Sequence, residues 1–204
     1  MINYLSDIDR LRAEIATTAA RMIAEDGADY GTAKRKAAKL VCGDAKISSD
    51  FMPDNAQVEQ EVRLYNELFL EDSQPARLLH LRKTAWRLMT ELSKFNPFLT
   101  GAVLNGTAGE HSDIYLHLFA DSAKDVEIYL LNQDIQFEVS ETPHFNGRSD
   151  AVETVSFMWH NEGVHLVLYD MDAMRGGARS GSGRKLERAG IPALQALILK
   201  SETP

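Results

Sequence analysis

The fold that we predict for this chain rests on the segment from Gly101 to Phe119, GAVLNGTAGEHSDIYLHLF. This segment begins inside a short apolar run from Phe98 to Leu104, which predicts a buried strand. A glycine-rich turn from Asn105 to Gly109 follows. From Asp113 to Phe119 polar and apolar residues alternate, which predicts a second strand. The segment is therefore predicted to form a strand, a turn and a second strand.

The glycine-rich turn could bring its backbone amides close to a phosphate group. Glycine permits the dihedral angles that aim successive amides at one anion, and Thr107 adds a hydroxyl donor. The turn is not a P-loop, because no Gly-Lys-Ser/Thr follows it, and it is not a dinucleotide fingerprint, because a strand follows where a helix is needed. We therefore expect Gly106, Thr107 and Gly109 either to bind phosphate or to form a plain connector.

The second strand carries three polar residues on one face. Asp113, Tyr115 and His117 are two residues apart, and a strand points every second side chain to the same side. Asp113 and His117 could bind a divalent ion, as a weak site with two ligands. Glu138, Glu153 and His165, on later predicted strands, would complete a polar cluster if they face the same way. The alternative is a set of half-exposed polar residues on a sheet.

The period of the apolar residues changes near residue 97. Before it, apolar residues recur every three or four positions, which predicts helices, and Asn96-Pro97 ends the last of them. After it, short alternating segments predict strands, with a hairpin turn at His160 to Gly163 and a closing helix. We therefore predict an α+β protein, with a helical region at 1–97 and a small mixed β-sheet with flanking helices at 98–204. The two regions could form one compact unit. The later elements are expected at 122–132 (helix), 135–139, 152–159 and 164–169 (strands), 144–150 (polar turn), 175–183 (mobile loop) and 191–200 (helix).

The composition is that of an ordinary globular protein. The chain has 204 residues, of which 44% are apolar and 25% are charged. A single cysteine excludes an intramolecular disulfide and a zinc cluster of thiolates. The first residues include acids and no apolar segment, so we expect no signal peptide, and no window approaches the length of a membrane span. These features predict a cytoplasmic protein without a membrane partner.

The net charge of −8 argues against a general nucleic-acid coat. Basic residues nevertheless gather in three places, and local basic surfaces can bind phosphate groups. We consider Lys34, Arg35 and Arg82 as candidate phosphate ligands. The alternative is that these side chains solvate the outer faces of helices. The three basic clusters are Lys34, Arg35, Lys36 and Lys39; Arg82, Lys83 and Arg87; and Arg175, Arg179, Arg184, Lys185 and Arg188.

The segment from Gly101 to Phe119 resembles the signature of the nucleotidyltransferase superfamily, which has the polymerase-β-like fold. In that family an apolar strand ends in Gly-Ser or Gly-Gly, the next strand carries Asp-x-Asp, and a third acid lies on a later strand. The resemblance matches Gly106-Thr107 to the Gly-Ser and Asp113 to the first acid. Tyr115 stands in place of the second acid. His165 stands where a third acid could lie, with Glu138 and Glu153 as rival positions.

The tyrosine changes what the resemblance implies. The acids of the family hold two Mg²⁺ ions, whereas a tyrosine stays neutral near pH 7 and Mg²⁺ prefers anionic oxygens. The resemblance therefore implies a degenerate site in a nucleotide- or RNA-binding or regulatory module, with no certain cofactor. One alternative is an active enzyme that transfers a nucleoside monophosphate with Mg²⁺ and in which Asp113 is catalytic. Another is a protein-interaction module or homodimer that uses the helical region.

Overall fold

The computed structural model describes residues 4–43, 48–144, 151–175 and 187–202, and it confirms the α+β class. Packing divides the chain into two compact units, one of residues 1–77 with 107–111 and one of residues 78–106 with 112–204. This division lies near residue 77, because most of α4 (Gln74–Glu91) packs with the sheet. The expected turn at 144–150 and loop at 175–183 fall almost wholly outside the described residues, as do Arg179, Arg184 and Lys185.

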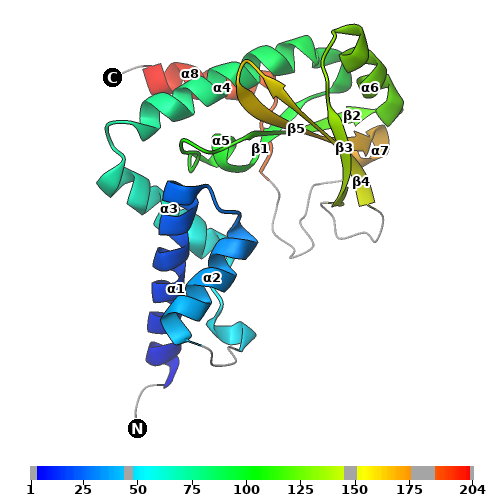
Figure 1. Ribbon diagram of the computed structural model, residues 1–204. Helices are drawn as coiled ribbons and strands as arrows, with labels where there is room; N and C mark the ends of the chain where they lie inside the picture. The colour runs from blue at the N-terminus through cyan, green and yellow to red at the C-terminus, as the bar shows by residue number, and fades with distance from the viewer. Residues whose placement is uncertain (1–3, 44–47, 145–150, 176–186, 203–204) are drawn as a thin grey trace. The chain divides into compact units, whose positions relative to one another are not determined.

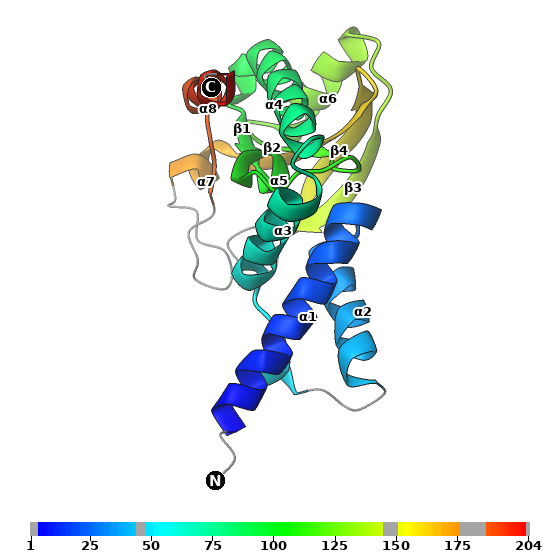
Figure 2. The ribbon, with the colours of Figure 1, turned by 90° about the vertical axis from the view of Figure 1, so that its left-hand side faces the viewer.

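The helical unit consists of α1 (Tyr4–Asp26), α2 (Tyr30–Cys42), the 3-10 turn η1 (Ser49–Phe51) and α3 (Asn55–Phe69). Both α2 and α3 pack against α1, as Figures 1 and 2 show. Their shared core is built mostly from small residues, which lets the helices approach closely. It contains Ile15, Ala16, Ala19 and Ala20 of α1, Ala33, Ala37 and Ala38 of α2, and Val58 and Val62 of α3.

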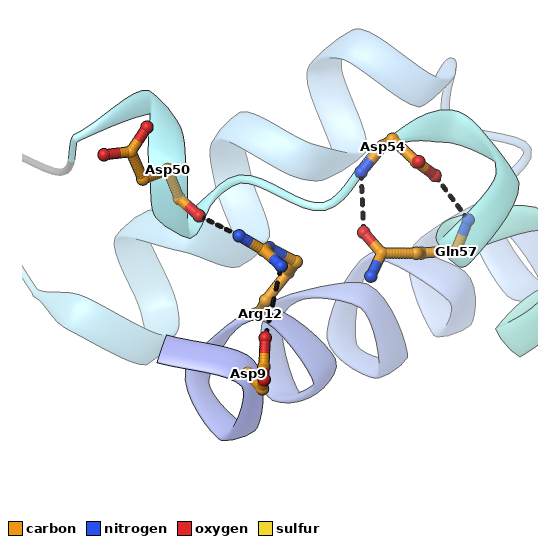
Figure 3. A network of polar contacts seen from close by, with 5 residues as sticks. All are labelled: Asp9, Arg12, Asp50, Asp54 and Gln57. Carbon is orange, nitrogen blue, oxygen red and sulfur yellow. Dashed lines mark hydrogen bonds and ion pairs between the residues drawn. The ribbon is translucent and has the colours of Figure 1, made fainter. Parts of the chain in front are cut away.

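Polar contacts fix the start of α3 and its neighbour η1 (Figure 3). The backbone amide of Gln57 donates to Asp54 Oδ1 at 2.8 Å, and the amide of Asp54 donates to Gln57 Oε1 at 3.0 Å, which forms a capping box. Arg12 of α1 donates to the carboxylate of Asp9 at 3.3 Å and to the carbonyl oxygen of Asp50 at 2.5 Å. These bonds satisfy amides and carbonyls that the helix ends would otherwise expose.

The second unit contains a five-stranded sheet in the order β1-β2-β5-β4-β3. Within this sheet β2 and β5 are parallel, and the other neighbours are antiparallel. The mixed sheet that we predicted is therefore present. The strands are β1 (Phe98–Thr100), β2 (Ile114–Ala120), β3 (Glu138–Pro143), β4 (Ala151–Trp159) and β5 (Glu162–Asp170). The helical elements are α4 (Gln74–Glu91), η2 (Ser93–Phe95), α5 (Gly101–Asn105), α6 (Ala123–Asn132), α7 (Met171–Arg175) and α8 (Ile191–Glu202).

The two faces of the sheet differ in their cover. One face carries fully buried residues such as Leu116, Leu118 and Leu166, and α4, α6 and α8 lie on its side (Figures 1 and 2). On the other face, Phe119, Val167 and Tyr169 pack with α7 at one end only. The opposite end of this second face carries the polar residues described below.

Three local predictions need correction. Residues 101–104, predicted as the end of a strand, belong to the short helix α5, which Gly106 ends with φ +89° and an amide that donates to the carbonyl oxygen of Ala102 at 3.0 Å. The third strand begins at Glu138 and not at Ile135, because the amide of Ile135 still bonds to the end of α6. The turn between β4 and β5 has two residues, His160 and Asn161, both with positive φ, which is typical of a tight hairpin.

None of the described helices is long and apolar enough to cross a membrane.

Candidate functional site

A row of five residues crosses all five strands on the partly open face of the sheet. Each member lies directly opposite the next in the strand register, and directly opposed residues point to the same face. The row is Thr100, Tyr115, His165, Ser156 and Glu138. The register therefore brings together three of the predicted polar residues, Tyr115, His165 and Glu138, on one face.

His165 lies at the centre of this row and makes two hydrogen bonds. Its Nε2 is 3.1 Å from Oδ2 of Asp113, the residue just before β2, and its Nδ1 is 2.8 Å from Oγ of Ser156 on β4. A carboxylate can only accept, so in the neutral ring the hydrogen lies on Nε2 and Ser156 donates to Nδ1. The three side chains thus form a hydrogen-bonded chain from β2 across β5 to β4.

Two further residues hold this chain in place. The ring of Tyr115 stacks on that of His165, with centroids 4.5 Å apart and an angle of 22° between the planes. On the other side, the carboxylate of Asp113 lies over Gly163, where a Cβ atom would be 2.2 Å from Oδ1. Only glycine leaves this space, so Gly163 is what allows Asp113 to reach His165.

An open groove of about 600 Å³ lies beside the chain on β3, β4 and β5. Its lining includes Asp113, Glu138, Ser156, Met158 and His165, and no lysine or arginine is among the described residues that line it. The volume falls in the range of small-molecule sites, and several polar groups converge on it. We call this hollow the sheet groove.

Two predicted site residues lie elsewhere. Glu153 is opposite Glu141 and an odd number of positions from Ser156, so it points to the other face of the sheet and does not join the cluster. His117 lies four residues along β2 from Asp113, which separates the two Cα atoms by about 13 Å. The predicted metal pair of Asp113 and His117 is therefore wrong, because the two side chains cannot share one ion. Among the described residues no group of three His, Cys, Asp or Glu side chains could hold a metal.

His117 is instead part of the buried end of this face. Its ring packs against that of Tyr169, with centroids 4.9 Å apart. Burial, together with the positive charges of Arg188 and His144, lowers the pKa of His117 from 6.5 to about 4. The side chain is therefore neutral near pH 7 and acts in packing.

The glycine-rich turn contributes no residue to the lining of the sheet groove. Thr107 is only 3% exposed, and its carbonyl oxygen accepts a hydrogen bond of 3.4 Å from the buried Asn66 of α3. A Cβ atom at Gly109 would lie 3.6 Å from the carbonyl oxygen of Ala24. We predicted that Gly106, Thr107 and Gly109 either bind phosphate or form a plain connector. The burial of the turn favours the connector.

Arg82 is a structural residue and not a phosphate ligand. It is 8% exposed, and its Nε and Nη2 donate to the carbonyl oxygens of Val103 and Leu104 at 3.1 and 3.2 Å. Its Nη1 donates to Oγ of Ser201 at 3.3 Å. Burial lowers the pKa of the Arg82 guanidinium. All three nitrogens are therefore used to join α4 to α5 and α8.

The other two basic candidates belong to the helical unit and make local contacts. Lys34 Nζ donates to Asn55 Oδ1 at 2.8 Å and to the carbonyl oxygen of Pro53 at 3.3 Å. Arg35 donates to Oγ1 of Thr32 at 3.1 Å. Lys34 thus links α2 to the start of α3, and Arg35 remains on the surface of α2.

The sequence reasoning missed Ser156 and Gly163. Both could have been found from the tight turn at His160-Asn161, because a two-residue turn fixes the register of the hairpin. Counting back from this turn places Ser156 opposite His165 and Met158 opposite Gly163. The four-residue turn that we predicted gives a different register.

Comparison with known proteins gives only weak support for a relationship. No family model matches the sequence, and no curated protein matches it. A chain in the structure of the GLD-2/RNP-8 complex has a TM-score of 0.30 and 16% sequence identity, and the match covers 57% of the present chain. The match covers 48% of that chain, so it spans about half of its length. A likeness at this level assigns neither a family nor an activity.

Proposed function

We propose that this chain is a nucleotidyltransferase-like protein that lacks two-metal catalysis and serves as a nucleotide- or RNA-binding or regulatory module. One observation carries the proposal. Tyr115 and His165, the residues in place of the second and third acids, lie directly opposite each other and stack. A phenol and an imidazole thus occupy the strand positions where the resemblance expects metal ligands, while Asp113 is bound to the imidazole.

The remaining carboxylates do not fit a pair of Mg²⁺ ions. Two-metal sites hold their ions about 4 Å apart with several shared oxygens. Glu138 is two strands away from His165, which corresponds to about 10 Å between their Cα atoms. Glu153 points to the opposite face. The site therefore offers Asp113 alone where the reaction needs a cluster of acids.

The test is a titration of the full chain with nucleoside triphosphates and with a short single-stranded RNA at low salt and without metal. Binding is followed by backbone amide chemical shifts, and we expect the largest changes at Ser156, Gly163 and His165. The variant Glu153→Gln is the matched control, because it alters a carboxylate of β4 on the other face of the sheet. If neither nucleotides nor RNA bind at low salt, the proposal is wrong.

An active nucleotidyltransferase is the second candidate, because Asp113 and Glu138 both line the sheet groove. Incubation with labelled nucleoside triphosphates and Mg²⁺ or Mn²⁺ tests it. If the wild type transfers a nucleoside monophosphate and Asp113→Ala does not, this second candidate is correct and our proposal is wrong.

A protein-interaction module or homodimer is the third candidate. It is favoured by large apolar residues exposed on α3, namely Leu64, Leu68 and Phe69. Light scattering over a range of concentrations tests self-association, which would appear as a mass that rises toward twice that of the chain.

A further inference from the structure

The geometry around His165 leaves one part of its ring available to a ligand. Asp113 and Ser156 occupy the two nitrogens in the plane of the ring, and Tyr115 covers one face. His165 nevertheless lines the sheet groove and keeps 25% of its side chain exposed. The surface that it offers to the groove is therefore its second face, a flat aromatic surface that Tyr115 supports from behind.

The charged groups that line the groove are both carboxylates, which accept hydrogen bonds, and Gln136 adds a neutral amide. Asp113 uses Oδ2 for His165, and its Oδ1 lies over Gly163 within the groove lining. Glu138 lines the same groove and is exposed. A ligand that donates hydrogen bonds from N–H groups complements these carboxylates, and a phosphate is repelled by them.

The groove also has an apolar side. Met158 is directly opposite Gly163 in the register, shares the face of Ser156, and is 67% exposed. A thioether side chain adapts to the shape of a flat ring and makes favourable contacts with aromatic groups. The groove therefore combines a stacking surface, an apolar side chain and two carboxylates.

We propose that the sheet groove binds a nucleobase with an exocyclic amino group, and that it holds the nucleotide by the base and not by the phosphates. The base stacks on the open face of His165 and its amino group donates to Asp113, while the phosphates extend into solvent. This inference rests on the proposed function, because nucleotide binding supplies the class of ligand. It also predicts selectivity: adenine, guanine and cytosine carry the amino group, whereas uracil has none and flanks its single N3–H donor with two carbonyl oxygens that the carboxylates repel.

The experiment compares nucleosides with their 5′-triphosphates at low and high salt. We expect adenosine, guanosine or cytidine to bind within about threefold of the corresponding triphosphate, with uridine weakest, because the base supplies the contacts. We expect the affinity to change little with salt, since few phosphate contacts release counterions. Backbone amide shifts at Gly163 and His165 report the site.

Two variants assign the binding to the groove. Asp113→Asn has nearly the same shape but loses the negative charge and replaces one acceptor oxygen by an NH2 donor. We therefore expect nucleoside affinity to fall by at least about tenfold, the loss of one good hydrogen bond to a charged group. Glu153→Gln removes the same charge from the other face and should bind nucleosides as the wild type does. Amide spectra that match the wild type away from the groove show that each variant is folded.

Each outcome has a distinct meaning. If triphosphates or RNA bind with strong salt dependence while nucleosides do not, base recognition is overturned and the proposed function stands. If nucleosides, nucleotides and RNA all fail to bind, both are overturned. If arginine amide binds in an Asp113-dependent way and nucleosides do not, the groove recognises a cationic side chain and base recognition is overturned.

Discussion

Acidification should destabilise the sheet unit through His117, and the size of the effect follows from its burial. The pKa of His117 is lowered from 6.5 to about 4 in the folded chain. Between these values the unfolded chain binds a proton that the folded chain rejects, so stability falls as the pH falls from 6.5 toward 4. At pH 5, about 1.5 units below the ordinary value, the loss relative to pH 8 is about 2 kcal/mol.

The assay is urea unfolding between pH 8 and pH 5, followed by tryptophan fluorescence. Both tryptophans, Trp86 and Trp159, belong to the sheet unit. In His117→Phe, which keeps a ring of similar size, this part of the pH dependence disappears. The stability of the variant relative to the wild type should therefore rise by about 2 kcal/mol from pH 8 to pH 5.

The matched control is Val167→Ala, because Val167 is opposite His117 in the register and does not titrate. We expect this variant to be less stable than the wild type by a constant amount at every pH, since it leaves a cavity beside an unchanged histidine. The reasoning is refuted if the wild type and His117→Phe lose stability in parallel as the pH falls.

Three further changes test other contacts. Arg82→Met removes the donor to the carbonyl oxygens of Val103 and Leu104, one in a buried and one in a part-buried contact. The sheet unit should therefore lose at least about 2 kcal/mol in urea unfolding, and a loss below about 0.5 kcal/mol would contradict the role of Arg82. Asp54→Ala removes the cap of α3 and should cost the helical unit about 1 kcal/mol in thermal unfolding, whereas Asp54→Asn should cost much less. Gly163→Ala places a methyl group against Asp113 and should change the imidazole nitrogen signals of His165, and unchanged signals would contradict the close approach.

The sequence was sufficient to predict the class of the fold and the face of the polar strand. Apolar residues at helical spacing predicted α1 to α4, and the alternation from Asp113 to Phe119 predicted β2 with Tyr115 and His117 on one side. These signals are strong because each extends over several turns or residues. The prediction of a strand at residues 101–104 failed because a short apolar run has no period that distinguishes a strand from a buried helix.

The assignment of Arg82 failed for a different reason. Its charge suggested a position on the protein surface. Arg82 nevertheless lies four residues after Leu78 and three before Ala85, on the apolar stripe of α4. Its position on that stripe was the informative signal, and the free carbonyl oxygens that it binds belong to α5, a helix that we had predicted as a strand. Because α5 was predicted as a strand, its carbonyl oxygens were not recognised as the partners of Arg82 on α4.

Which residues belong to the polar cluster depends on the register between neighbouring strands, and the sequence of a single strand does not determine that register. The sequence predicts which side chains share a face within a strand, but the relation between strands depends on turn length and on the order β1-β2-β5-β4-β3. Glu153 was included and Ser156 omitted because the sequence does not establish which residues of β4 share a face with His165.

The parallel pairing of β2 with β5 has a consequence for the order of folding. Ser156 and His165 are separated by a two-residue turn and can meet as soon as the β4–β5 hairpin forms, an event of microseconds. Asp113 and His165 are 52 positions apart, so their contact requires closure of a long loop and has a larger entropic cost. We expect the sheet groove to be completed late, after the hairpin is in place. A ligand that needs Asp113 should then slow unfolding and leave the folding rate almost unchanged.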